Sequence, residues 1–211
     1  MKTNDLIREL AREGVPIKPL ASPLIRFSRW FMASFFCLAT GVVVYGLRSD
    51  LETTMQNPTF YLQTLFLLAL AGLSAFSAFV LSIPDRKKPG LDIVPLVTLV
   101  LWVGVILVSG FHSEHFASGM GLSCAREIFV LGFLPGILLF IMIRQAAPLQ
   151  LGKVGAFCAL SVAGLGALGT QFICREDNAL HVLVWHYTPV LLLGGFGILL
   201  GRVFFKWKLD R

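Results

Sequence analysis

The sequence predicts an all-α integral membrane protein with six transmembrane helices in one bundle and both termini in the cytoplasm. Of its 211 residues, 56% are hydrophobic and only 14% are charged, and the mean hydropathy is +0.78. A soluble domain of this length would carry more charge for so much apolar surface. The apolar residues also form continuous blocks, unlike the alternating or amphipathic patterns of soluble strands and helices.

Residues 1–23 form a short polar segment ahead of the first apolar block. Thr3 or Asn4 can cap a helix that ends near Glu13, and the prolines that follow favour an extended chain. A helix this short is not stable alone in water. It is therefore expected either to lie on the membrane surface or to become ordered against a partner. Its apolar residues share one face: Leu6, Ile7 and Leu10.

Residues 24–211 form the second unit, the transmembrane domain. Six apolar blocks in it are long enough to cross a hydrocarbon core as helices, which takes about 20 residues each. Their approximate bounds are Ile25–Leu47, Phe60–Ile83, Ile93–Phe111, Ser123–Ile143, Val154–Ile173 and Val182–Phe205. No ionisable residue lies near the centre of a block, although proton relays and transport paths normally require one.

Small residues recur every fourth position in the last two blocks. This spacing lets helix backbones approach closely, so it predicts tight packing. The residues are Gly155, Ala159, Ala163 and Ala167 in the fifth block, and Gly197 and Gly201 in the sixth.

The basic residues are distributed unequally between the two predicted faces. Fifteen of the 18 lysines and arginines lie on the side of the termini, and only Arg48, Arg126 and Arg175 lie on the other. The positive-inside rule therefore places both termini in the cytoplasm. Because this asymmetry accounts for the net charge of +6, no direct contact with nucleic acid is expected.

Histidine and cysteine residues gather at the predicted outer face. The stretch "ICREDNALHVLVWHY", residues 173–187, lies there together with the loop that precedes the fourth block. These two stretches contain every histidine of the chain and two of its four cysteines, namely His112, His115, His181, His186, Cys124 and Cys174.

Three interpretations of this cluster are open. Cys124 and Cys174 can form a disulfide in an oxidising compartment. Alternatively, thiolates and imidazoles can bind zinc or another thiophilic ion. A metal ion at this cluster is the one cofactor that the sequence suggests. In the third interpretation the histidines only cap helices and anchor them at the interface. His181 and His186 are five residues apart and would diverge by about 140° on an α-helix, so they are not expected to form a two-histidine motif.

The sequence contains no phosphate loop and no HExxH, GxSxG or CxxC motif, so no enzymatic activity is expected. An alternative function is that of a membrane thiol oxidoreductase or a thiophilic-metal transporter. An oxidoreductase would be expected to show a reactive cysteine pair such as CxxC, and a transporter polar ligands along a path through the membrane.

The chain resembles the negative regulator of sigma F family of membrane anti-sigma factors. The resemblance rests on "MKTNDLIREL", "VPIKPLASPL", Cys124 within "GLSCA", and above all "CREDNALHVLVWHYTPVLLLG". The last stretch is similar to the family's pattern at Cys174, Asp177, Ala179, Leu180, His181, Trp185, His186 and Pro189.

This resemblance implies a regulator that holds an extracytoplasmic-function sigma factor at the bacterial inner membrane. It also implies that Cys124 and Cys174 respond to heavy-metal or oxidative stress. The sigma factor would bind the N-terminal segment. The residues expected to contact it are Leu6, Ile7, Leu10, Ile17 and Leu20.

Overall fold

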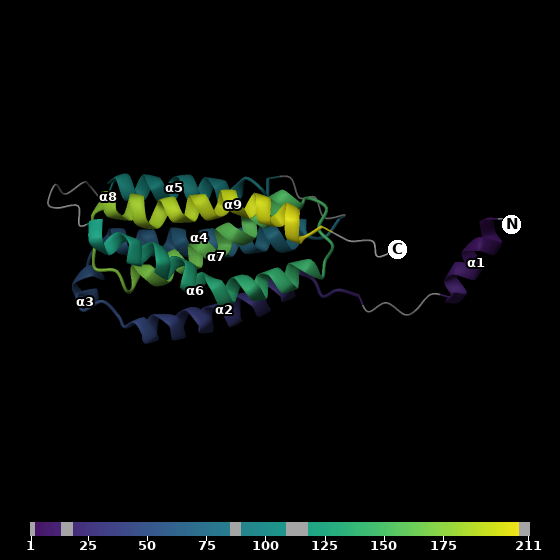
Figure 1. The fold of residues 1–211 in the computed structure, drawn as a ribbon, viewed down its shortest axis with the longest axis horizontal. Helices are drawn as coiled ribbons and strands as arrows, with labels where there is room; N and C mark the ends of the chain where they lie inside the picture. Colours follow the sequence, from purple (N-terminus) through teal and green to yellow (C-terminus); the bar gives the residue numbers. More distant parts are fainter. Residues whose placement is uncertain (1–2, 14–18, 85–89, 109–117, 207–211) are drawn as a thin grey trace.

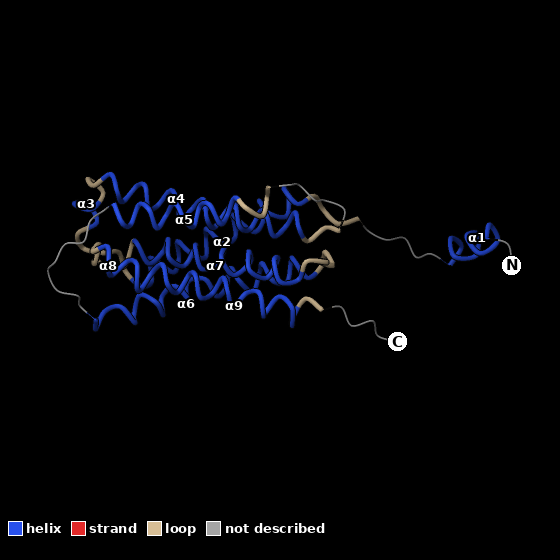
Figure 2. The backbone as a smooth tube through the Cα atoms, turned by 90° about the horizontal axis from the view of Figure 1, so that it is seen from above, coloured by secondary structure: helices blue, strands red, loops and turns tan. Residues whose placement is uncertain are grey.

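The computed structural model describes residues 3–13, 19–84, 90–108 and 118–206. This part of the chain is helical and has no strands, and its long helices lie side by side in one elongated bundle (Figures 1 and 2). In chain order the helices are α1 (Thr3–Glu13), α2 (Pro23–Tyr45), α3 (Leu51–Thr54), α4 (Pro58–Leu81), α5 (Val94–Val108), α6 (Ser118–Arg144), α7 (Leu151–Gln171), α8 (Ala179–Val182), the π-helical turn η1 (Leu183–Tyr187) and α9 (Thr188–Phe204).

Five of the described helices are long and apolar enough to cross a membrane. They are α2, α4, α6 from Gly121 onwards, α7, and the continuous helix of α8, η1 and α9. In the third predicted span, the described helix α5 has 15 residues and is about 22 Å long, against a hydrocarbon core of about 30 Å. The end of that block, residues 109–111, lies outside the described residues.

The helices run back and forth between two ends of the bundle. Figure 1 shows that α2 begins and α9 ends at one end, while α3 and α8 lie at the other. The α1 helix has the bounds expected from the sequence, and it stands apart from the bundle beyond the end where α2 begins (Figure 1).

Local sequence signals determine where the first long helices begin and end. The Ser22 hydroxyl and the Asn57 side chain accept backbone hydrogen bonds at the starts of α2 and α4, and a proline occupies the first turn of each helix. Gly46, with φ of 88°, ends α2 in a backbone conformation that disfavours other residues.

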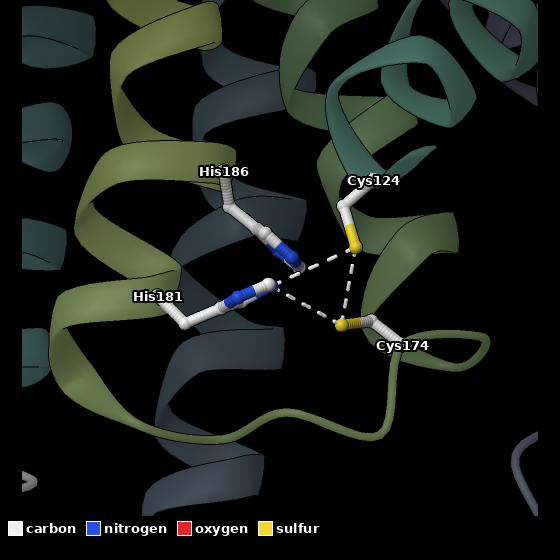
Figure 3. Close-up of side chains that lie close together, drawn as sticks. All are labelled: Cys124, Cys174, His181 and His186. Carbon is white, nitrogen blue, oxygen red and sulfur yellow. Dashed lines mark hydrogen bonds between the residues drawn. The ribbon is translucent and has the colours of Figure 1, made fainter. Parts of the chain in front are cut away.

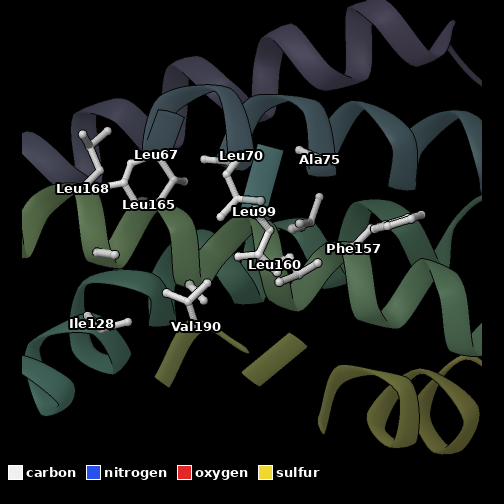
Figure 4. Packing of buried hydrophobic residues seen from close by; sticks show 14 of the residues in the cluster. Leu67, Leu70, Ala75, Leu99, Ile128, Phe157, Leu160, Leu165, Leu168 and Val190 are labelled. Carbon is white, nitrogen blue, oxygen red and sulfur yellow. The ribbon is translucent and has the colours of Figure 1, made fainter. Parts of the chain in front are cut away.

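The α7 helix lies at the centre, packed against α4, α6 and α9, and most of its residues are buried. Figure 4 shows its leucines among those of neighbouring helices. The predicted small-residue contact is confirmed: a Cβ atom on Gly155 or Gly197 would clash with the backbone of the facing helix. The resulting close packing of α7 and α9 supports the segment between them, which carries the candidate site.

Candidate functional site

Four side chains form a buried thiol–imidazole cluster at the end of the bundle where α3 and α8 lie. They are Cys124, Cys174, His181 and His186, and they point toward one another in Figure 3. One ligand atom from each lies within 4.8 Å of the others, and the four residues are between 3% and 8% exposed. Cysteine and histidine are the preferred ligands of zinc and other thiophilic ions.

Three separate parts of the chain contribute to the cluster. Cys124 lies near the start of α6, and Cys174 lies just beyond α7, where its backbone N–H donates to the Thr170 carbonyl at 2.7 Å. His181 belongs to α8, which begins after Asn178, whose side chain accepts the Leu180 N–H at 2.9 Å. The site therefore exists only when α6 and the α7–α9 hairpin are packed together.

The distances between these side chains fit one small metal ion. Cys124 Sγ and Cys174 Sγ are 3.6 and 3.5 Å from His181 Nε2. Tetrahedral zinc, with bonds of about 2.3 Å to sulfur and about 2.0–2.1 Å to nitrogen, places these two atom types about 3.5 Å apart. The two sulfur atoms are 3.3 Å apart, against about 3.8 Å around such an ion. The two sulfur atoms and His181 Nε2 therefore already lie close to the positions that they would take around a bound metal ion.

The prediction that His181 and His186 diverge is wrong. Their rings are 5.5 Å apart, because the helix between them widens into the π-helical turn η1. Here the Thr188 N–H donates to Leu183 O, five residues back, so residues five apart share a face. The turn directly precedes Pro189, which has no N–H to donate and whose ring would clash with the Trp185 carbonyl in an α-helix.

The His186 ring lies close enough to Cys174 to affect the pKa of that thiol, yet its Nε2 atom meets no hydrogen-bond partner at normal bonding geometry among the described residues. Within the described part of the chain, no hydrogen-bond partner reaches the buried His186 Nε2, and the same holds for Glu127 Oε2 and Trp102 Nε1. A small cavity of about 10 Å³, close to the size of one water molecule, is lined by Cys174, His186 and Trp102 among others. A bound ion would supply the missing partner for His186.

The two thiols are not equivalent. The Cys124 thiol donates a hydrogen bond to Cys174 Sγ and lowers the pKa of Cys174, an effect that His181 and His186 increase and burial opposes. Cys174 is therefore the thiol that loses its proton more readily. The two sulfur atoms are 3.3 Å apart, against a disulfide bond length of about 2.05 Å, and are not joined in this structure.

An ion-pair network beside the cluster was not predicted from the sequence. The Arg48 guanidinium donates to both carboxylate oxygens of Asp177 at 2.8 and 2.7 Å and to both of Asp50 at 2.9 and 2.8 Å. Burial would lower the pKa of Arg48, but these hydrogen bonds outweigh it and raise that pKa. The hydrogen bond from Arg48 lowers the pKa of Asp50 to about 2.

The remaining predicted residues are placed as follows. His112 and His115 lie outside the described residues, as does Ile17, and nothing is described of the Leu10 side chain. Leu6, Ile7 and Leu20 are 43%, 58% and 44% exposed, so these three are available to a partner.

A family model described as negative regulator of sigma F matches residues 10–207. This match includes all four members of the thiol–imidazole cluster and the whole bundle from α2 to α9. Comparisons with curated proteins and with solved structures gave no match.

Proposed function

The chain belongs to the negative regulator of sigma F family, and from this premise we propose how it regulates. It is a membrane anti-sigma factor that binds an extracytoplasmic-function sigma factor on the cytoplasmic side of the bacterial inner membrane. It releases that factor when heavy-metal or oxidative stress changes the pair of Cys124 and Cys174. The family supports negative regulation of a sigma factor, and the thiol–imidazole cluster supports the choice of signal.

The observation that carries the proposed sensor is the convergence of two thiols and two imidazoles from α6 and the α7–α9 hairpin. A thiophilic cation would bind all four and displace the two thiol protons. An oxidant would instead join the sulfur atoms, removing two protons and two electrons. Either change holds α6 and the Cys174 segment in a fixed relative position, so it favours one arrangement of the bundle.

The proposed topology has six crossings, with α5 as the third and both termini in the cytoplasm. The positive-inside rule supports it, because the basic residues gather at the end of the bundle where α2 begins. Those in the described helices at this end are Arg26, Arg29, Arg144, Lys153 and Arg202. The thiol–imidazole cluster then faces the oxidising periplasm.

The proposed binding segment is residues 1–23. The exposed apolar face of α1, with Leu6 and Ile7, is suited to an apolar groove on the sigma factor, and Leu20 extends that surface towards the membrane. Sequestration follows from this placement, because a sigma factor held at the membrane by this segment is kept from RNA polymerase.

Serine substitutions test the sensor. Cys124→Ser, Cys174→Ser and the double variant should all repress in unstressed cells, and in each of them Cd²⁺ or diamide should no longer raise sigma-dependent transcription. Cys158→Ser is the matched control, because Cys158 lines an apolar groove between α6, α7 and α9 and should leave the response intact. A double variant that responds like the unmodified protein at equal abundance would refute the proposed sensor.

A further inference from the structure

We propose that Arg48 is the residue through which a change at the thiols reaches α2, the helix that leads to the N-terminal segment. Arg48 is a positioning residue here, since it touches neither sulfur atom but holds the segment that carries Cys174. This inference rests on the proposed function and adds the route by which the site controls the rest of the chain.

The contacts of Arg48 flank Cys174 on both sides. Its backbone N–H donates to the Phe172 carbonyl at 3.0 Å, two residues before Cys174. Its guanidinium donates to the Arg175 carbonyl at 3.1 Å and to both carboxylate oxygens of Asp177. Residues 174–178, between α7 and α8, have no regular secondary structure, and the contacts of Arg48 hold this segment on both sides of Cys174.

These contacts hold Arg48 and the Cys174 segment in a fixed relative position. The Arg48 side chain is only 1% exposed, and a two-pronged arginine–carboxylate pair fixes both distance and orientation. A buried guanidinium that loses its partners is strongly disfavoured. Arg48 and the Cys174 segment are therefore expected to move together.

Arg48 also lies close to the end of α2. Only two residues separate it from Tyr45, the last residue of α2, and the Gly46 N–H donates to Val42 O and holds the turn against that helix. The α2 helix is about 34 Å long and leads at its other end into the N-terminal segment. Movement of Arg48 would thus be transmitted along a rigid element to the partner-binding end.

The α2 helix is bonded to both elements that carry the thiols. Near its start, Trp30 Nε1 donates to Pro135 O at 3.0 Å and the Arg26 guanidinium donates to Met142 O, both on α6. Cys124 lies on α6 as well, whereas Arg48 joins the far end of α2 to the Cys174 segment. The contacts with α6 hold the start of α2, so a shift of the Cys174 segment relative to Cys124 would reach α2 at its Arg48 end.

The test compares Asp177→Asn with Asp50→Asn in the full-length protein in lipid nanodiscs. Asp177 joins Arg48 to the Cys174 segment, whereas Asp50 pairs with Arg48 within one loop, so Asp50→Asn is the matched control. Hydrogen exchange of α2 and residues 19–22 is measured with and without CdCl₂. We expect Cd²⁺ to change these exchange rates about fivefold or more in the unmodified protein and in Asp50→Asn. In Asp177→Asn the change should be confined to residues 172–186 and to α6, which carries Cys124.

Arg48→Lys is the second variant, because lysine keeps the charge but cannot form the two-pronged pair. Cd²⁺ binding measured on each variant shows whether the thiol site is intact. A full α2 response in Asp177→Asn and Arg48→Lys would overturn the role of Arg48. The same role is overturned if either variant shows the Cd²⁺-bound exchange pattern without Cd²⁺, since Arg48 would then only hold the resting state.

The two proposals fail in different ways. If the double variant Cys124→Ser/Cys174→Ser still shows the α2 response to Cd²⁺, the proposed sensor is wrong and the role of Arg48 falls with it. If Cd²⁺ leaves α2 exchange unchanged in that double variant but changes it fully in Asp177→Asn, only the role of Arg48 is wrong.

Discussion

His186 faces the thiols only because of the π-helical turn η1, and replacing it tests whether the four side chains act as one ligand set. The His186→Ala and His181→Ala variants each remove one imidazole and leave both sulfur atoms in place. We expect each to weaken Zn²⁺ binding by roughly 10²–10³-fold. Zn²⁺ is a suitable probe because its preferred distances match those between Sγ and Nε2.

The magnitude follows from the number of ligands. Zinc sites with four protein ligands have apparent binding free energies of about 10–16 kcal/mol, or about 2.5–4 kcal/mol per ligand. At about 1.4 kcal/mol for each factor of ten, the loss of one ligand corresponds to roughly 10²–10³-fold in the dissociation constant. Unlike a solvent-facing histidine, His186 is 4% exposed, so water does not easily take its place.

The assay is competition for Zn²⁺ against a chromophoric chelator, with purified protein in detergent and reduced thiols. Cys158→Ser serves as the control and should bind like the unmodified protein. Disulfide formation by diamide, measured in the same preparations, should persist in both histidine variants because it needs only the two sulfur atoms. Unchanged Zn²⁺ affinity in both variants would refute the four-ligand site.

Three further predictions concern other parts of the chain. Leu6→Asp should weaken the complex with the sigma factor tenfold or more in a pull-down titration, since burying one leucine contributes about 1.5–3 kcal/mol; undiminished binding would place the contact elsewhere. Reporter fusions at Arg211 and within residues 112–122 should report opposite sides of the membrane, and the same side for both would contradict six crossings. Gly197→Ala should destabilise the bundle by about 1–3 kcal/mol in thermal unfolding, because its Cβ would lie 2.5 Å from that of Ala159. Gly195→Ala, where a new Cβ meets nothing within 4 Å, should not, and equal loss in both would remove the packing argument.

Much of the architecture could be predicted because it depends on composition and local signals. The local features are long apolar blocks, prolines after capping residues and glycines at every fourth position. The structure has helices where these features predict them. The proximity of Cys124 and Cys174 was also predictable, because the sequence places both at ends of transmembrane helices on the same side of the membrane. The third span stays a prediction, because the described part of α5 is 15 residues long and the end of the predicted block lies outside the described residues.

Two features of the site could not be predicted from periodicity. His186 was assigned to the wrong face because a 3.6-residue period was assumed through a turn that widens before Pro189; that proline was the available signal. Arg48 was counted only as one of three outer basic residues. Its partner Asp177 lies 129 positions further along the chain, and only the packed bundle brings the two together.

Burial of the thiol–imidazole cluster bears on which signals it can receive. Both cysteines are less than one-tenth exposed, so a bulky oxidant such as diamide reaches them only when the bundle opens locally, whereas a small ion or peroxide needs less opening. Net charge imposes a second restriction, because an uncompensated charge in a buried site is costly. Two thiolates and two neutral imidazoles carry a charge of about −2, which a divalent cation neutralises and a monovalent one does not. On this argument a buried site of this composition favours divalent thiophilic cations such as Cd²⁺ or Zn²⁺ over monovalent ones. The preference would be lost if the cluster were exposed to water, so it depends on the close packing of α6 against the α7–α9 hairpin.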